Sequence, residues 1–201
     1  IISETEDQDK REKLVKILAH DVERIERLIT DYSQMLKDEV ALSTEKMNKI
    51  DLISIVQSVV DDFNNIYIEK RGIKTELITD NYIKEFKILG IENRIEQILA
   101  NLLENAISFS RDNQKIIVEV KKNQNDQVVL RVIDQGQGFR EKKLNKIFDR
   151  FYSNRPDKFG EHSGLGLNIV KNLVELHGGV IAASNNTDQR GARIEIAFPK
   201  V

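Results

Sequence analysis

The feature that most limits how this chain can fold is a long stretch without glycine or proline, from Lys10 to Leu42. Its apolar residues recur at alternating spacings of four and three, which predicts one helix with a heptad seam. A second apolar row beside the first makes this face wide enough for a helical bundle. Because a lone helix with such a face would be insoluble, we expect the chain to form a homodimer through it. The two rows are Leu14, Leu18, Ile25, Leu28, Tyr32, Met35 and Leu42, and Val15, Val22, Ile29 and Leu36.

The rest of the chain predicts an α+β domain of two layers, with helices on one face of a mixed, largely antiparallel sheet. The expected elements do not alternate strictly between strand and helix, which argues against a parallel α/β fold. We place the boundary between the helical extension, residues 1–45, and the globular domain, residues 46–201, near a polar joint at Ser43 and Thr44. The expected helices cover 52–70, 92–109 and 165–176, and the expected strands cover 73–79, 86–89, 115–122, 127–133, 180–184 and 192–198.

Composition excludes several classes of function. Lysine and arginine total 31 against 33 aspartates and glutamates, so the charge balance gives no electrostatic reason to expect a nucleic-acid partner. The absence of cysteine excludes disulfides and thiolate sites and suits the cytoplasm. No apolar run reaches the roughly 20 residues that span a bilayer. Since the chain starts at Ile1 with neither an initiator methionine nor a signal peptide, we expect it to be part of a longer protein.

Two amides and a carboxylate lie close together in the segment Asn101–Asn105, on the helix expected over 92–109. Asn101 and Asn105 are four apart and share a face, where their carbonyl oxygens could reach a hard cation such as Mg²⁺ together with phosphate oxygens. Glu104 neighbours that face. Taken alone, an asparagine pair is more often simply a solvated helix face.

A glycine-containing loop, Asp134–Gly138, follows the expected strand 127–133. A carboxylate at the end of a strand can accept a hydrogen bond from the exocyclic amine of adenine, while Gly136 and Gly138 let the backbone approach the base. A turn that needs positive φ is the alternative interpretation, and for such a loop alone it is the commoner one.

The segment Gly164–Leu167 is rich in glycine and runs directly into the expected helix 165–176. The backbone N–H groups of a first helical turn point at any anion in front of them. The sequence contains neither the G-K-[ST] of a Walker loop nor the G-x-G-x-x-G of dinucleotide folds. Each of these three segments is a modest signal, but their order, spacing and structural contexts together are specific.

These segments resemble the N, G1 and G2 boxes of the histidine kinases, and Phe148–Phe151 resembles their F box. The resemblance covers roughly residues 14–199 and lies within the wider ATPase class of gyrase, Hsp90 and MutL. It implies a Bergerat ATP-binding fold over 46–201, preceded by the second helix of a dimerisation and histidine phosphotransfer region. The implied activity is transfer of the ATP γ-phosphate to a histidine, with Mg²⁺ as cofactor, for relay to an aspartate of a cognate response regulator.

The resemblance also implies roles for individual residues. Asp134 is expected to bind adenine, Asn105 to bind Mg²⁺, and Asn101 to contact the phosphates or the metal. Glu104 corresponds to the proposed general base, which draws the proton from the attacking imidazole. Phe148 and Phe151 are expected to pack in the core or the lid. The full ATP-binding set is Asn101, Asn105, Asp134, Gly136, Gly138, Gly164, Leu165, Gly166, Leu167, Arg155 and Lys158. Arg155 and Lys158 lie in the lid segment, where they could contact the γ-phosphate or, alternatively, be solvated residues of a loop.

The chain departs from the family pattern at two places. Ser108 stands where many relatives carry Lys or Arg, which removes one usual phosphate contact. Gly191 is followed by Ala192 and Arg193 where the family has a second glycine and a threonine. Neither change removes the residues expected to bind the nucleotide.

None of the three histidines has the context of a phosphate acceptor. His20 precedes an acid, as in the acceptor motif, but no proline follows and the helix is the second of the bundle. His162 is expected in the exposed lid, and His177 is expected to end a helix and to pack. We therefore expect the acceptor histidine to lie outside this chain, which should not phosphorylate itself.

Two other functions stay open at this point. A gyrase-like or MutL-like engine would need a transducer domain after the nucleotide fold. A degenerate signalling scaffold that binds nucleotide weakly is favoured by Ser108 and Ala192, whereas Asn105, Asp134 and Glu104 argue against it. The resemblance is compatible with a parent protein in the inner membrane that holds this part in the cytoplasm.

Overall fold

The computed structural model describes residues 8, 10–19, 21–22, 25–26, 29–30, 32–33, 45–80, 85–152, 164–187 and 190–201, which fall into a segment before Glu45 and a domain from Glu45 onward. Every described residue between 8 and 33 is helical, as the heptad pattern predicts. Apolar side chains of this helix, among them Leu14, Ile25 and Ile29, are more than half exposed. Residues 34–42 of the predicted helix lie outside the described residues. None of the described helices is long and apolar enough to cross a bilayer.

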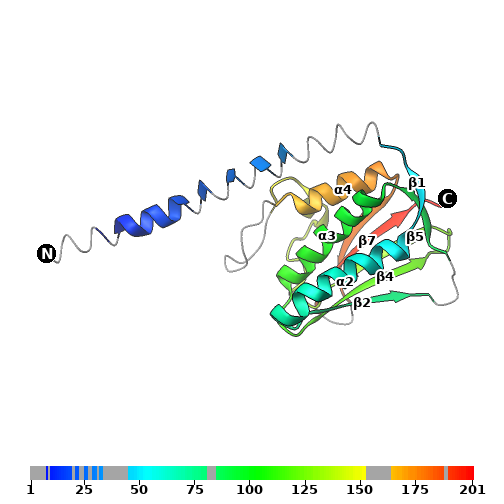
Figure 1. The fold of residues 1–201 in the computed structure, drawn as a ribbon, viewed down its shortest axis with the longest axis horizontal. Coiled ribbons are helices and arrows are strands. Elements are labelled where there is room, and N and C mark those ends of the chain that lie inside the picture. Colours follow the sequence, from blue (N-terminus) through cyan, green and yellow to red (C-terminus); the bar gives the residue numbers. More distant parts are fainter. Residues whose placement is uncertain are drawn as a thin grey trace. The chain divides into compact units, whose positions relative to one another are not determined.

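The domain is built on a five-stranded sheet with three helices packed on one face (Figure 1). The strand order is β2-β4-β5-β7-β6, in which β2 and β4 run parallel and the other neighbours antiparallel. This arrangement confirms the predicted α+β sandwich. The strands are β2 (Lys74–Thr79), β4 (Lys115–Lys122), β5 (Val128–Ile133), β6 (Val180–Asn185) and β7 (Ala192–Phe198), and the helices are α2 (Leu52–Arg71), α3 (Glu92–Phe109) and α4 (Gly166–Leu176).

Strand alternation decides which face of the sheet is buried. In β7, Ile194, Ile196 and Phe198 are buried toward the helices, while the residues between them are half-buried on the other face. That other face carries a charged ladder, in which Arg131 pairs with Glu119 at 2.8 Å and with Glu195. The sheet is therefore apolar on one side only, and the site has to form between this side and the helices.

Two short elements differ from the sequence prediction. A four-residue strand, β1 (Asn48–Asp51), pairs antiparallel with β3 (Lys87–Gly90) in a separate two-stranded sheet. Three of its four residues are exposed, so no alternation marks it in the sequence. A 3₁₀ helix, η1 (Leu144–Phe148), lies between the strand predicted over 127–133 and the helix predicted over 165–176, where no helix or strand was expected. Such helices are short and carry little periodicity.

The C-terminal end of α3 is held by Arg71, the last residue of α2. Its guanidinium donates to the carbonyl oxygens of Ile107 and Ser110, each at 2.8 Å, and pairs with Asp112 at 2.8 Å. The last carbonyls of a helix lack partners within the helix, so these bonds satisfy acceptors that would otherwise need water. α2 itself stops at Gly72, whose φ of 63° lies in the left-handed region that favours glycine.

The other end of α3 is linked to α4 through His177. The buried imidazole donates from Nδ1 to the carbonyl of Leu173 at 2.6 Å, and its Nε2 accepts the backbone N–H of Ile91 at 3.1 Å. Because Nε2 accepts an N–H, this arrangement holds the neutral ring. Burial lowers the pKa of His177, opposed by the Leu173 carbonyl. The predicted packing role of His177 is confirmed, and it fixes α4 against the start of α3.

Candidate functional site

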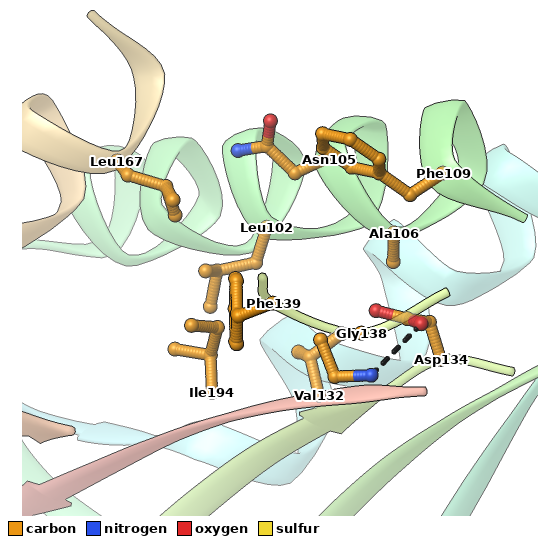
Figure 2. A pocket seen from close by; sticks show the side chains of 11 residues that line it. Leu102, Asn105, Ala106, Phe109, Val132, Asp134, Gly138, Phe139, Leu167 and Ile194 are labelled. Carbon is orange, nitrogen blue, oxygen red and sulfur yellow. Dashed lines mark hydrogen bonds between the residues drawn. The ribbon is translucent and has the colours of Figure 1, made fainter. Parts of the chain in front are cut away.

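A pocket lies between α3, the buried side of the sheet and the loop after β5 (Figure 2). Its walls are mainly apolar, and its polar side chains are Asn105 and Asp134. A largely apolar pocket with a few placed polar groups is the usual form of a small-molecule site. The lining residues are Leu102, Asn105, Ala106, Phe109, Val132, Asp134, Gly138, Phe139, Leu167, Ala192 and Ile194.

Asp134 supplies a buried carboxylate at one end of this pocket. Its Oδ1 accepts the backbone N–H groups of Gly136 at 2.8 Å and Ala192 at 3.0 Å. Burial raises the pKa of Asp134, while these two N–H donors oppose the rise. In Figure 2 the other carboxylate oxygen points toward the side chains that line the pocket. The pocket therefore presents a fixed hydrogen-bond acceptor among apolar walls. This combination suits a flat ring that carries an exocyclic amine.

The two glycines of the loop have different surroundings. A Cβ on Gly136 would lie 2.6 Å from the carbonyl oxygen of Phe109, so this glycine lets the loop pass close behind the end of α3. Gly138 lines the pocket, adopts a φ of +75°, and would place a Cβ 2.8 Å from Oδ1 of Asn185. Both positions thus need glycine for the packing of the loop itself, and Gly138 also faces the pocket.

The predicted amide pair meets the start of α4. Asn101 donates from Nδ2 to the carbonyl of Gln97 at 2.9 Å, an i−4 bond along α3. A Cβ on Gly166 would lie 3.0 Å from Oδ1 of Asn101 and 3.6 Å from Nδ2 of Asn105. The absence of a side chain at Gly166 therefore lets the first turn of α4 approach both amides, which brings their polar atoms next to the N–H groups of a helix start.

The residues before α4 are held by packing. Gly164 has a φ of +71°, and a Cβ there would lie 2.9 Å from the carbonyl carbon of Phe151. The Leu165 side chain is fully buried in the core, so any contact of this residue with a ligand has to come from its backbone. Buried Asn168 donates to the carbonyl of Phe148 at 2.9 Å, which ties α4 to η1.

The other residues predicted for the site do not line the pocket or lie outside the described residues. Glu104 is exposed on α3 and is not among the lining residues. Phe148 is buried as predicted, whereas Phe151 is 57% exposed with a φ of 61°, so Phe151 does not pack in the core. Residues 153–163 of the lid, its other predicted location, lie outside the described residues. Arg155, Lys158, His20 and His162 lie outside the described residues.

Sequence reasoning missed most of the apolar lining. Phe139 follows the glycine loop directly, and its aromatic ring next to a candidate base site was the signal available. Leu102 and Ala106 are buried on the inner face of α3, and the alternation of β5 and β7 marks Val132 and Ile194 as inward-facing. The sequence does not show that α3, β5 and β7 converge on one pocket.

The two departures from the family pattern have local explanations. Ser108 donates its hydroxyl to the carbonyl of Asn105 at 2.8 Å, so it is bonded to its own helix. Ala192 acts through its backbone, since its N–H bonds the Asp134 carboxylate and its carbonyl accepts from the Asp134 N–H, each at 3.0 Å.

Comparison with known proteins identifies the domain. Residues 90–201 match the family described as histidine kinase-, DNA gyrase B-, and HSP90-like ATPase. The sensor protein ChvG of Agrobacterium fabrum is 33% identical over 96% of this chain, which covers 34% of ChvG. The chain thus spans about a third of the length of this curated relative.

Solved structures agree with this assignment. The catalytic domain of the histidine kinase ThkA is 27% identical, with a TM-score of 0.66 over 78% of this chain and 97% of that one. ThkA in complex with the response regulator protein TrrA gives 25% identity and a TM-score of 0.67 over 86% of this chain and 48% of that one. The chain therefore belongs to the histidine kinase-, DNA gyrase B- and HSP90-like ATPase family, and its relatives in that family include sensor histidine kinases.

Proposed function

We propose that this chain is the ATP-binding catalytic part of a sensor histidine kinase, which transfers the γ-phosphate of ATP to a histidine for relay to a response regulator. The observation that carries the proposal is the pocket, which has the buried carboxylate of Asp134 at one end and is lined by Asn105, where Gly166 at the start of α4 approaches the amides of both Asn101 and Asn105. The sensor kinases among the relatives support the proposal, since 96% of this chain matches the sensor protein ChvG.

The residues present fit an adenine nucleotide with Mg²⁺. Asp134 would accept from the exocyclic amine, and the apolar walls would hold the ring. Asn101, with the first turn of α4 at Gly166, would contact the phosphates or the metal, and Asn105 would ligate Mg²⁺ through its carbonyl oxygen. When bound, the nucleotide supplies a transferable phosphoryl group whose charge Mg²⁺ neutralises.

Glu104 would take the proton of the attacking imidazole. It lies on α3 directly before Asn105, and its exposed position leaves it accessible to an acceptor that approaches from outside the pocket. Arg155 and Lys158 remain predicted contacts of the γ-phosphate. Gly164 and Leu165 would contribute only their backbone, since the Leu165 side chain belongs to the core.

The proposed partners follow from two observations. The structural similarity to ThkA in its complex with TrrA supports a response regulator as partner. The exposed apolar face of the N-terminal helix supports a homodimer, in which a second copy covers Leu14, Ile25 and Ile29. Sedimentation should then show a dimer that Ile25→Glu disperses and that Lys13→Glu, on a charged position of the same helix, leaves intact; a monomeric wild-type chain at high concentration contradicts this.

Phosphotransfer is tested by adding a fragment that carries the parent's acceptor helix, together with radiolabelled ATP and Mg²⁺. Acid-labile label should appear on the added fragment and not on this chain alone. Glu104→Gln should slow the transfer more than it weakens ATP binding, because a proton acceptor acts in the transition state. Acid-labile label on His20 in this chain alone contradicts the assignment of the first helix, and absence of nucleotide binding at millimolar concentration favours the scaffold alternative.

A further inference from the structure

Two consecutive asparagines at the end of β6 hold the loop that carries Asp134. Asn185 is the last residue of β6 and lies opposite Ala192 in β7. Its Nδ2 donates to the carbonyl of Phe139 at 3.0 Å, and its Oδ1 accepts the N–H of Phe139 at 2.7 Å. One carboxamide thus satisfies both backbone groups of a loop residue, as a neighbouring strand would.

Asn186 holds the other end of the same loop. Its Nδ2 donates to the backbone carbonyl of Asp134 at 3.0 Å, and its own N–H bonds the carbonyl of Gly191 at 3.0 Å. Ala192 donates its N–H to the Asp134 carboxylate at 3.0 Å. Asp134 is therefore fixed through its backbone and its side chain by residues on either side of the β6–β7 connection.

The fit between the asparagines and the loop leaves little room for adjustment. A Cβ on Gly138 would lie 2.8 Å from Oδ1 of Asn185, and a Cβ on Gly191 would lie 2.6 Å from Nδ2 of Asn186. Neither asparagine is among the residues that line the pocket, whereas the loop residues that they hold, Asp134 and Phe139, are its acceptor and its aromatic wall. The two amides therefore act on a ligand only through the loop.

We infer that Asn185 and Asn186 are positioning residues that set the preference of the pocket for a base with an exocyclic amine. The inference rests on the proposed nucleotide binding. A carboxylate accepts from an amine, so discrimination requires that the carboxylate stays where the edge of the base lies. When the loop loses its amide partners, Asp134 can move with it, and a base without the amine should then bind nearly as well as one that has it.

The test measures the affinities of ATP and of purine riboside triphosphate, which lacks the 6-amino group, for four proteins by titration calorimetry. Wild type should bind ATP about tenfold more tightly than the analogue, as for one hydrogen bond to a charged group. In Asn185→Leu this ratio should fall below about threefold, and in Asn186→Ala, which loses one bond, it should lie between these values. Asn125→Ala, in an exposed hairpin turn, should behave as wild type.

The outcomes separate positioning from simple stabilisation of the fold. A lower melting temperature with an unchanged ratio in both variants overturns the inference, as does a wild-type protein that binds both nucleotides equally. Wild-type protein that binds neither nucleotide contradicts the proposed function itself. If Asn185→Leu does not fold, Asn185→Asp replaces it in the test, because this variant keeps the acceptor and loses the donor. An unchanged affinity ratio in both Asn185→Asp and Asn186→Ala again overturns the inference.

Discussion

The two ends of the pocket are built in different ways. At the Asp134 end, the loop is held by side-chain and backbone hydrogen bonds from Asn185, Asn186 and Ala192, all far away in the sequence. At the Asn105 end, the site arises where two helices meet, with Gly166 of α4 against the amides of α3. The first end is fixed before any ligand arrives, whereas the second offers helix N–H groups and amides that a charged group can use.

This difference implies a division of labour. A fixed, buried carboxylate suits the recognition of a neutral ring, because an acceptor that cannot move discriminates between ring edges. Amides and a helix start suit phosphates and Mg²⁺, which tolerate several arrangements of oxygen and N–H partners. Changes at the two ends should therefore affect different parts of the ligand.

The largest effect is expected from Asp134→Asn, which keeps the shape of the side chain and removes its charge. Loss of a hydrogen bond to a charged group costs about 1.5–3 kcal/mol, so ATP affinity should fall roughly ten- to a hundredfold. Calorimetry with the exposed Asp62→Asn as a matched control measures this effect. Equal affinities for the two variants would show that the base does not reach Asp134.

Asp134 also predicts a pH dependence at its own end. Because burial raises the pKa of Asp134 above the ordinary value of 3.8, the carboxyl takes up a proton at a higher pH than an exposed aspartate does. The accepting form is then fully present above the folded pKa and is lost as the pH falls through it. ATP affinity should fall on acidification in the wild type and depend less on pH in Asp134→Asn. Parallel pH profiles of the ATP affinity in the two proteins would contradict this assignment.

A smaller effect is expected at the other end from Asn105→Ala. Removal of one neutral ligand to a cation should weaken Mg²⁺-dependent ATP binding by roughly fivefold, about 1 kcal/mol. The same variant should change ATP binding little in the presence of EDTA, because the amide then has no cation to coordinate. Asn93→Ala, exposed at the start of the same helix, is the control. Equal losses with and without Mg²⁺ would mean that Asn105 supports the fold or the base instead.

The same contrast explains what the sequence could predict. The bounds of α3 and β7 are as predicted, because 3.6-residue and two-residue periodicities are local signals. The amides of α3 and the glycines before α4 were found as motifs for the same reason. The asparagines that hold the Asp134 loop were not found, since Asn185 meets its partner 46 residues away and nothing in its neighbours marks it. β1 was missed because its pairing with β3 is also non-local.

Both ends depend on the link between the two site helices, and His177 should make this link sensitive to acid. Folding lowers the pKa of His177 from 6.5, so below about pH 6.5 the unfolded chain binds a proton that the native protein does not. The free energy of unfolding should therefore decrease as the pH falls from about 6.5 toward the folded pKa. Urea denaturation at several pH values should show this slope in the wild type and a weaker one in His177→Gln; identical slopes would contradict the assignment.

The smallest effect is expected on the face of the sheet away from the pocket. Arg131→Met removes the partly exposed pairs with Glu119 and Glu195, which should cost about 1 kcal/mol of stability or less. Nucleotide affinity should not change, since the side chain points away from both ends of the site. A weaker affinity for ATP in this variant would show that the sheet transmits changes across its layers.

The central claim is that Asp134 recognises the base and Asn105 recognises the phosphates with Mg²⁺, within one pocket. The most direct test compares the affinities of adenosine and of ATP with Mg²⁺ for the wild type, Asp134→Asn and Asn105→Ala. Asp134→Asn should weaken both ligands by a similar factor, whereas Asn105→Ala should weaken ATP with Mg²⁺ and leave adenosine unchanged. An Asn105→Ala variant that loses adenosine as strongly as ATP, or an Asp134→Asn variant that keeps adenosine, would contradict the account.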